Sequence, residues 1–380
     1  MRVGFDITPH NANRMTGAGR VVAGYARTFS SMADGPELVL IGFRENFHGL
    51  EDLDPARVDR RIIRRASTLG PAAGEVGRWR GVRSLSTRRG FEIFHANLEM
   101  VVPAKRIPVV YHLYDLVRMD PEAKRRDRSL RAKVRTQLRY GLADRADAIV
   151  TISRASREDI SRRLGIDPDR IRVIHPGIED RFFDVRPAQV DLVLRRYGLD
   201  AGYALFVGQL GRQKNESLLL SAWEKVSGEL GAARVVIAGD SSTAEPGFGL
   251  KAKRVDAKLL GRVADEDLPA LISGAGALIL TSTNEGFGLP VAEALAAGTP
   301  VIVGDRGALP EVAGDAGVIV PADDADSLSR ALLEVLSDHA RSRELREKAR
   351  ARGRMFRWDR AAGQMLDLYS EVVSRKRSGK

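Results

Sequence analysis

Short apolar runs recur along the chain, and each is followed by a segment with the spacing of an amphipathic helix. Runs of this composition are typical of strands that are buried on both faces of a parallel sheet. The expected strands of a first series cover residues 2–7, 38–43, 93–95, 109–113, 148–152 and 172–175. Those of a second series cover residues 204–208, 235–238, 258–260, 277–281, 301–303 and 317–320. The alternation predicts an α/β chain with two doubly wound, Rossmann-like units.

Length and the break between the two series predict two domains. A chain of 380 residues with 43% hydrophobic content is more than one core usually organises. Residues 181–198 separate the series and contain Pro187 and a short helix-like stretch at 188–197, as a linker would. We expect a first domain over residues 1–185 and a second over residues 186–355.

Two loops of the second series are placed where α/β sheets bind ligands, which is beyond the carboxyl ends of the strands. One covers residues 208–215 and the other residues 282–290. In the second loop Gly286 and Gly288 permit positive φ, and Pro290 suits the first position of a helix. The amides at that helix start predict an anion pocket for a diphosphate, with N–H groups from Leu289 and Val291.

Charged side chains in the same loops extend this interpretation. The carboxylates of Glu285 and Glu293 are separated so that they reach different parts of one ligand, for instance hydroxyls of a sugar and of a ribose. Arg212 and Lys214 of the first loop would neutralise a diphosphate and the charge that develops on it during reaction. Because these cations would take the place of a metal ion, we expect no required metal.

The second half of the chain resembles the donor half of retaining glycosyltransferases of family four. The segments that carry the resemblance are 208–215, 260–268, 285–293, 298–302 and 309–312. The tail from Phe356 to Tyr369 resembles the family's C-terminal helix, which implies that residues 356–380 cross back to the first domain. The resemblance implies the GT-B fold, in which two Rossmann-like domains face each other across a cleft.

The first half matches a mannosyltransferase-like branch of that family more loosely, through residues 16–20, 94–97, 114–116, 151–153 and 173–178. The resemblance implies that Glu285 contacts the donor sugar, Glu293 the ribose, and Arg212 and Lys214 the diphosphate. It also implies that a loop at Gly17 and Gly19 closes over the site. The remaining residues expected to act by resemblance are Gly208, Gly286, Phe287, Gly288, Leu289 and Val291 for the donor, and His95 and Asp115 for catalysis.

Three positions depart from the family pattern. Gln209 stands where the family often has Arg, which leaves the diphosphate to Arg212 and Lys214. The common His-Asp pair is replaced by Tyr114-Asp115, with His112 two residues earlier. Asn97 stands where many members carry His, so His95 is the remaining imidazole of that strand.

The implied reaction moves a hexose from a nucleoside-diphosphate sugar to a glycan, a lipid-linked acceptor or a small molecule. Mannose from GDP-mannose is the leading donor, and UDP- and ADP-sugars stay open. No further cofactor is expected. A sugar-nucleotide epimerase of similar two-domain shape is an alternative, because it would bind the same nucleotide sugar without an acceptor.

The net charge of +11 favours an anionic partner. Residues 124–139 hold eight Lys and Arg against the single acid Asp127, and Leu130, Val134 and Leu138 form an apolar stripe between them. This stretch is either a solvated helix face or a surface for a membrane or an acceptor. A nucleic-acid-binding protein is the second alternative, but only 6% of residues are aromatic and none lies in this stretch, so we expect no nucleic-acid partner.

The N-terminus lacks the apolar stretch of a secretory signal. We therefore expect a cytoplasmic protein, with peripheral contact to the inner membrane face through residues 124–139.

Two features that resemble catalytic motifs are better explained as helix caps. The acidic triplets at 265–267 and 324–326 resemble metal motifs, but we expect them to cap helices. Ser153 lacks a nucleophile elbow and is expected to cap a helix as well.

Overall fold

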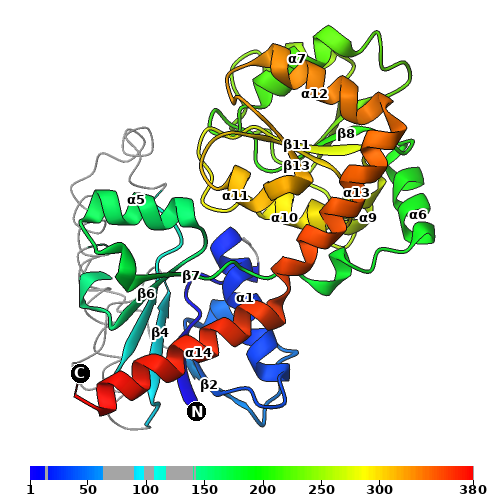
Figure 1. Ribbon diagram of the computed structural model, residues 1–380. Coiled ribbons are helices and arrows are strands. Elements are labelled where there is room, and N and C mark those ends of the chain that lie inside the picture. Colours follow the sequence, from blue (N-terminus) through cyan, green and yellow to red (C-terminus); the bar gives the residue numbers. More distant parts are fainter. Residues whose placement is uncertain (13–15, 63–89, 98–106, 117–139, 141–142, 380) are drawn as a thin grey trace. The chain divides into compact units, whose positions relative to one another are not determined.

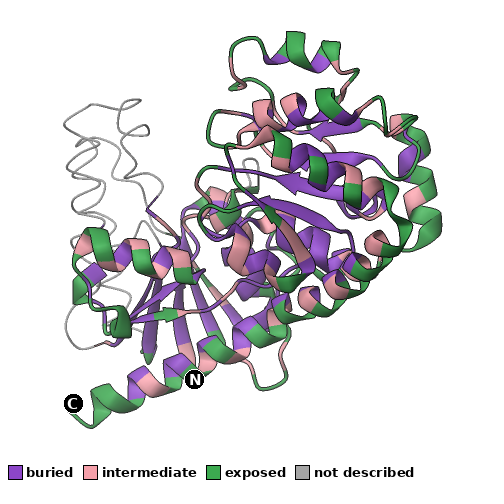
Figure 2. Ribbon diagram, turned by 45° about the horizontal axis from the view of Figure 1, so that its top comes forward, coloured by how far each residue is buried: buried purple, intermediate pink, exposed green. Residues whose placement is uncertain are grey.

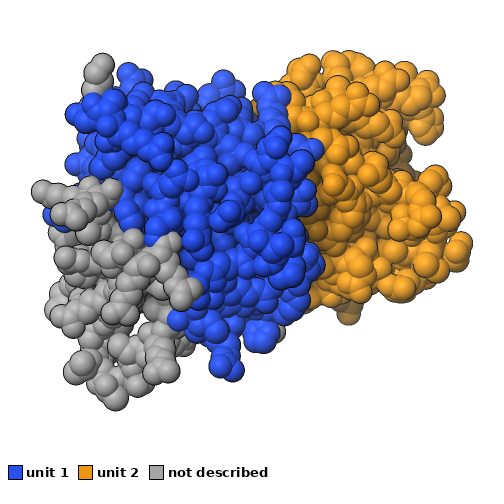
Figure 3. Space-filling model, turned by 90° about the horizontal axis from the view of Figure 1, so that it is seen from below, with its two compact units in different colours: residues 1–177, 358–380 blue, residues 178–357 orange. Residues whose placement is uncertain are grey.

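The computed structural model describes residues 1–12, 16–62, 90–97, 107–116, 140 and 143–379. Two compact units divide the chain (Figures 1 and 3). Unit 1 comprises residues 1–177 and 358–380, and unit 2 comprises residues 178–357. The division thus falls at Gly177/Ile178, whereas the boundary expected from sequence was 185/186.

Unit 1 is built on a seven-stranded parallel sheet with the strand order β3-β2-β1-β4-β5-β6-β7. Its strands are β1 Arg2–Asp6, β2 Glu37–Gly42, β3 Val58–Ile62, β4 Ile93–Asn97, β5 Val109–His112, β6 Ala148–Thr151 and β7 Ile171–Val173. Its described helices are α1 Gly17–Ser31, α5 Arg154–Leu164 and α14 Trp358–Arg377, with 3-10 turns η2 Arg44–Phe47, η4 Ala143–Arg145 and η5 Pro168–Arg170. All six expected strands of the first series form, and β3 is added to them.

Unit 2 contains a six-stranded parallel sheet with the order β10-β9-β8-β11-β12-β13. Its strands are β8 Ala204–Val207, β9 Val235–Ala238, β10 Lys258–Gly261, β11 Ala277–Leu280, β12 Val301–Gly304 and β13 Gly317–Val320. Its helices are α6 Pro187–Tyr197, α7 Glu216–Val226, α8 Phe248–Arg254, α9 Leu268–Gly274, α10 Leu289–Ala296, α11 Leu309–Ala313, α12 Ala325–Ser337 and α13 His339–Gly353. Three 3-10 turns complete it, η6 Asp180–Phe182, η7 Gly314–Ala316 and η8 Arg354–Phe356.

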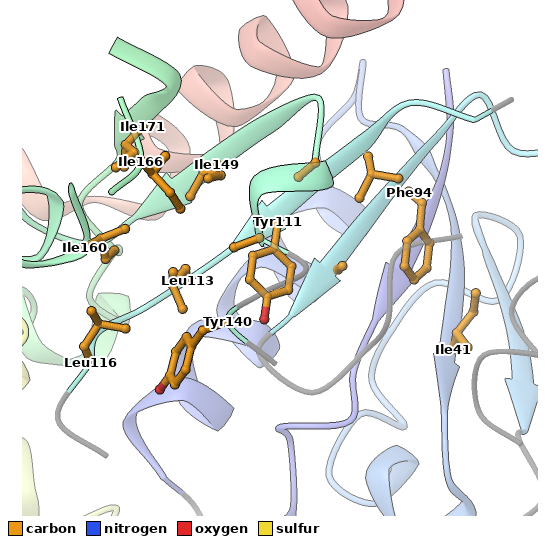
Figure 4. Packing of buried hydrophobic residues seen from close by; sticks show 14 of the residues in the cluster. Ile41, Phe94, Tyr111, Leu113, Leu116, Tyr140, Ile149, Ile160, Ile166 and Ile171 are labelled. Carbon is orange, nitrogen blue, oxygen red and sulfur yellow. The ribbon is translucent and has the colours of Figure 1, made fainter. Parts of the chain in front are cut away.

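The cores follow from the apolar strands, whose central members are buried in both units (Figure 2), whereas edge strands such as β10 are partly exposed. In unit 1 one face of the sheet packs Phe94, Tyr111 and Ile149 against Ile160 of α5 (Figure 4). The pattern that predicts parallel strands covered on both faces is therefore confirmed. The stretch expected as a linker belongs instead to unit 2, where its helix α6 packs on α9.

The C-terminal helix α14 belongs to unit 1 and packs on α1. At its first residue, the indole of Trp358 lies in the space beside two glycines. A Cβ at Gly24 would come within 1.9 Å of the indole, and one at Gly177 within 2.4 Å. Tyr25 adds an edge-on ring contact with a centroid distance of 5.1 Å. The packing of α14 on unit 1 thus depends on Gly24 and Gly177, which have no Cβ to collide with the Trp358 indole.

Candidate functional site

Both candidate loops of unit 2 lie at the point where the strand order of its sheet reverses. Strands β8 and β11 are neighbours, and the connections from them run to opposite sides of the sheet. Loop 208–215 follows β8 and loop 281–288 follows β11. In doubly wound sheets ligands bind at this switch point, because the two connections diverge there and leave a crevice at the carboxyl ends. The strand order therefore explains why the two loops lie next to each other, which the pattern of strands along the sequence could not show.

The first loop approaches the neighbouring strand end very closely. Gly208 and Gly211 have φ of 147° and 155°, a region that favours glycine. A Cβ at Gly239 would come within 1.7 Å of the carbonyl oxygen of Gly208. Thr243 also fixes the loop, because its hydroxyl donates a hydrogen bond to the carbonyl oxygen of Leu210 at 2.6 Å. These contacts require a nearly fixed backbone path from β8 into the loop.

A turn at the end of this loop presents the two expected cations. The amide of Lys214 donates to the carbonyl oxygen of Gly211 at 2.7 Å, which closes a turn over Arg212. Asn215 follows in the left-handed region, with φ of 57°, and its side-chain amide donates to the carbonyl oxygen of Ala322 at 2.6 Å. Arg212 is exposed and Lys214 half-buried just before α7 begins.

The second loop brings Glu285 to the same place. Its carboxylate forms an ion pair with the Lys214 ammonium and accepts a hydrogen bond from the Ser282 hydroxyl at 3.2 Å. The side chain of Glu285 is only 13% exposed, so a cation beside it offsets part of its desolvation. The amide of Thr283 donates to the carbonyl oxygen of Gln213 at 2.9 Å, which joins the two loops through the backbone. Glu285 and Lys214 therefore place opposite charges side by side at the switch point.

The start of α10 differs from our expectation at one amide. Gly288 precedes the helix with φ of 89°, which suits its glycine, and Pro290 occupies the second helical position rather than the first. The N–H of Val291 donates to the carbonyl oxygen of Gly288 at 2.9 Å. This amide is therefore used within the first turn, and the expectation that Val291 supplies an N–H to a ligand is corrected. Because Gly288 adopts a left-handed conformation, the chain turns so that the Gly288 carbonyl oxygen accepts the N–H of Val291.

Glu293 lies inside α10 and is almost completely buried, with 3% of its surface exposed. Gly286 and Phe287 are buried as well, and the Phe287 ring packs edge-on against Phe356 at a centroid distance of 5.6 Å. Gly286, Phe287 and Glu293 are therefore buried in the packing of unit 2, whereas the carboxylate of Glu285 in the loop is partly exposed.

His95, expected as a catalytic residue, lies in the core of unit 1. It is fully buried, its Nδ1 contacts the Tyr369 hydroxyl of α14, and its Nε2 lies 3.3 Å from Nδ1 of His112. Burial holds the pKa of His95 well below its usual range and lowers that of His112 to about 3. Both imidazoles are therefore neutral at pH 7. The geometry assigns His95 to the packing of α14 on the sheet, and we do not retain it in the catalytic proposal.

A polar network that sequence reasoning missed surrounds these histidines. The Tyr114 hydroxyl donates to Asn97 Oδ1 at 2.7 Å, and Asn97 in turn donates its amides to Asp6 at 2.6 and 3.1 Å. These residues lie at the carboxyl ends of β1, β4 and β5, near Asp115 in the chain. Asn97 and Tyr114 stood out in the sequence as departures from the family pattern, but no signal in the sequence indicated that they bond to each other and to Asp6.

The glycines expected to form a closing loop are helical instead. Gly17 begins α1, and the amide of Gly19 donates to the Thr16 hydroxyl at 3.1 Å. Thr16 is thus an N-cap, and the short polar side chain favours a helix start where we expected a loop. Asp115 follows β5 as expected and is half-buried.

The acidic triplets behave differently from each other. Asp324 caps α12 by accepting from the amides of Asp326 and Ser327, as expected. Asp267 occupies the N-cap position of α9 but pairs with Arg196 at 2.7 Å instead of capping the amides. Ser153 caps α5 by accepting from Ser156 at 2.9 Å, as expected. Within the described ranges, no three His, Asp or Glu side chains cluster as metal ligands.

The basic stretch 124–139 lies outside the described residues. None of the helices that can be described is both long enough and apolar enough to span a bilayer.

Comparison with known families accounts for both halves of the chain. The family model "Glycosyltransferase Family 4" matches residues 15–182, and the model "Glycosyl transferases group 1" matches residues 198–353. O-antigen chain mannosyltransferase B of Escherichia coli is 33% identical over 236 residues, which are 60% of this chain and 61% of the relative. A D-inositol 3-phosphate glycosyltransferase of Xylanimonas cellulosilytica is 34% identical over 245 residues, 61% of this chain and 58% of the relative. The chain thus matches about three fifths of the length of these two relatives.

Solved structures with the same fold match almost end to end. Anabaena Alr3699/HepE, solved in complex with UDP-glucose, has a TM-score of 0.74 and 18% identity, over 98% of this chain and 100% of that one. A glycosyltransferase from Rickettsia africae has a TM-score of 0.72 and 16% identity, over 98% of both chains. At such identities the likeness concerns the fold, which is the GT-B arrangement of two parallel sheets with flanking helices. The two family models, which match residues 15–182 and 198–353, show that the chain belongs to the family-four glycosyltransferases.

Proposed function

We propose that the chain is a retaining hexosyltransferase whose unit 2 holds a nucleoside-diphosphate sugar at the β8–β11 switch point. The observation that carries the proposal is the ion pair of Lys214 and Glu285, which puts a cation for the diphosphate beside an acceptor for sugar hydroxyls. A partly buried pair of this kind acts more strongly on a charged ligand than an exposed pair would, because less water screens it. The two loops that carry the pair are already joined at Gln213 and Thr283.

Each charged residue has a place in this proposal. Lys214 and exposed Arg212 bind the diphosphate oxygens, where they supply the positive charge that a metal ion supplies in other transferases. Glu285 accepts hydrogen bonds from the hexose, and Glu293 from the ribose. Gly208, Gly286, Phe287 and Gly288 shape the backbone around the donor, and the Leu289 amide lies at the helix start.

In the proposed reaction the bond between the anomeric carbon and the diphosphate oxygen breaks while a bond to an acceptor hydroxyl oxygen forms on the same face of the sugar. The acceptor proton passes to the departing diphosphate. Lys214 and Arg212 stabilise the charge on that diphosphate as it leaves. The acceptor is assigned to unit 1, where Asp115 is the proposed catalytic residue. Gly17 and Gly19, at the start of α1, are assigned to donor binding.

GDP-mannose is the leading donor. Two relatives are named as mannosyltransferases, O-antigen chain mannosyltransferase B and the MMP alpha-(1->4)-mannosyltransferase of Mycolicibacterium hassiacum, which is 26% identical over 328 residues. UDP- and ADP-sugars are the other candidates, since the structurally similar HepE was solved with UDP-glucose. The acceptor is a glycan, a lipid-linked glycan or a small molecule such as a sugar phosphate or cyclitol phosphate. The proposed location is cytoplasmic, with residues 124–139 as the contact to an anionic membrane.

A donor panel tests this function. Purified protein is titrated with GDP, UDP and ADP and with their hexose conjugates, and release of the nucleoside diphosphate is followed with and without candidate acceptors. We expect one base to be preferred in binding and release to depend on the acceptor, with retained anomeric configuration in the product by NMR. Conversion of the sugar without an acceptor would instead indicate the epimerase alternative. Steeply salt-dependent binding of mixed oligonucleotides would favour a nucleic-acid protein.

A further inference from the structure

Glu216 is a buried acid whose burial needs a physical reason. It is the first residue of α7 and is fully buried. Its Oε2 accepts a hydrogen bond from the amide of Gly211 at 3.1 Å. Its Oε1 is also buried and has no hydrogen-bond partner among the residues described by the structure. Desolvation of a carboxylate with one oxygen unpaired costs free energy that an apolar side chain at this position would not cost.

The helix start explains only part of this arrangement. A negative charge in the first turn is favoured by the unpaired amides and the dipole of α7. An exposed acid at the same position would gain that interaction without losing water. The burial of Glu216 is therefore explained by its other interaction, the hydrogen bond that its carboxylate accepts from the Gly211 amide.

That bond closes a ring of six residues around the two cations. Gly211 begins the turn that Lys214 ends, and the turn contains Arg212. From Lys214 the chain passes through Asn215, in the left-handed region, directly to Glu216. The carboxylate of Glu216 then returns to the amide of Gly211. The path between the two ends of this ring includes the backbone of both Arg212 and Lys214.

We propose that Glu216 is a positioning residue, which fixes the turn from Gly211 to Lys214 so that Arg212 and Lys214 face the diphosphate of the donor. The inference rests on the proposed function for the identity of that ligand. Glu216 itself does not touch the donor in this account. It acts through the amide of Gly211, and its effect disappears when the two cations are absent.

Three variants separate this role from a general effect on stability. Glu216→Ala removes the acceptor, while Glu216→Gln has the same shape and keeps an oxygen that accepts from Gly211. Glu224→Ala, on the same helix but half exposed, is the matched control. Affinity for GDP and UDP is measured by calorimetry, turnover by nucleoside diphosphate release, and amide exchange by mass spectrometry of peptides covering residues 208–216.

We expect Glu216→Ala to weaken nucleoside diphosphate binding by about tenfold and to speed amide exchange in the loop. Glu216→Gln should remain within about threefold of the original protein, because the hydrogen bond survives. Glu224→Ala should change neither quantity. In a chain that already carries Arg212→Ala and Lys214→Ala, the substitution Glu216→Ala should cause no further loss of binding, since the groups it positions are gone.

Two results would overturn the inference. One is an unchanged affinity and exchange rate in Glu216→Ala. The other is the same tenfold loss in the chain without the two cations, which would show that Glu216 acts elsewhere. If the unmodified protein binds no nucleoside diphosphate, the proposed function fails by itself, and the exchange of residues 208–216 still decides whether Glu216 holds the turn.

Discussion

The Lys214 ammonium pairs with the Glu285 carboxylate although 71 positions of the chain separate the two residues. Each comes from a loop after one of two adjacent strands, so the sheet topology, and not proximity in sequence, brings them together. The pair has two functions in our account. It supports a nearly buried acid in the resting protein, and it supplies charge to the donor during reaction.

Substitution of Lys214 by Ala should lower turnover by a factor of about 10² or more, because a preorganised cation at the departing diphosphate is lost. It should also lower the thermal midpoint, since Glu285 loses its counter-charge while only 13% exposed. Turnover and a thermal unfolding curve are measured on the same preparation. Lys225→Ala on α7, whose pair with Asp326 is exposed, serves as the control and should alter neither.

Substitution of Arg212 by Ala should lower turnover by a factor of order 10² while the unfolding midpoint stays constant. The reason for the difference from Lys214 is exposure, because Arg212 lies on the surface of the turn. Exposed Arg234→Ala is a suitable comparison. Near-normal turnover in both the Arg212 and Lys214 variants would refute the diphosphate role of this loop.

Substitution of Gly24 by Ala should destabilise unit 1 by about 1–3 kcal/mol, the usual range for overpacking a core. The added Cβ would come within 1.9 Å of the Trp358 ring. The ring also lies close against Gly177 and contacts Tyr25 edge-on. Chemical unfolding provides the measurement. Gly363→Ala on α14 is the matched control, because no atom of the described residues outside the adjacent turns of α14 lies within 4 Å of its Cβ position. Ala also favours a helix, so stability should stay equal or rise. Equal effects of the two substitutions would contradict the proposed anchoring of α14.

The pH dependence of stability should show a contribution from His112. Its pKa in the folded protein is about 3, against 6.5 for the ordinary side chain, because burial disfavours the charged form. Between these values the unfolded chain binds a proton that the folded chain does not. The contribution to stability is therefore complete above pH 6.5 and falls as the pH drops toward 3, with a slope of up to about 1.4 kcal/mol per pH unit.

Free energies of unfolding between pH 4 and 7 test this dependence. His112→Gln should flatten the curve, whereas His48→Gln, at an exposed position, should leave the slope as it is. A curve of unchanged slope in His112→Gln would mean that the imidazole does not stay neutral in the folded protein.

The strands could be predicted from sequence wherever both faces are buried. Twelve apolar runs were expected, and each forms a strand in the predicted sheet. Strand β3 was missed because its sequence, Val-Asp-Arg-Arg-Ile, has three charged residues in a row and lies at the edge of the sheet. At the edge, β3 contacts one neighbouring strand and carries charge, so it lacks the composition of a buried run.

The candidate site was partly predictable for the same reason. Loop positions and the charges of Arg212, Lys214 and Glu285 follow from the strand ends, and the structure brings Lys214 and Glu285 together. The contacts of His95 and Glu216 did not follow. Tyr369 is 274 positions from His95, and nothing local indicates that its hydroxyl reaches the imidazole. A lone acid after Asn215 is indistinguishable in sequence from an ordinary helix-start charge.

Because α14 supplies Trp358 and Tyr369 to unit 1, the two units cannot finish folding in their order of synthesis. Residues 1–177 leave the ribosome first, yet Tyr369, which contacts His95 of their sheet, is made only much later. Unit 2 is continuous in sequence and has all of its core by residue 357. During translation the first half of the chain therefore has to wait, with part of its apolar surface uncovered, for a helix that is synthesised after the whole of unit 2.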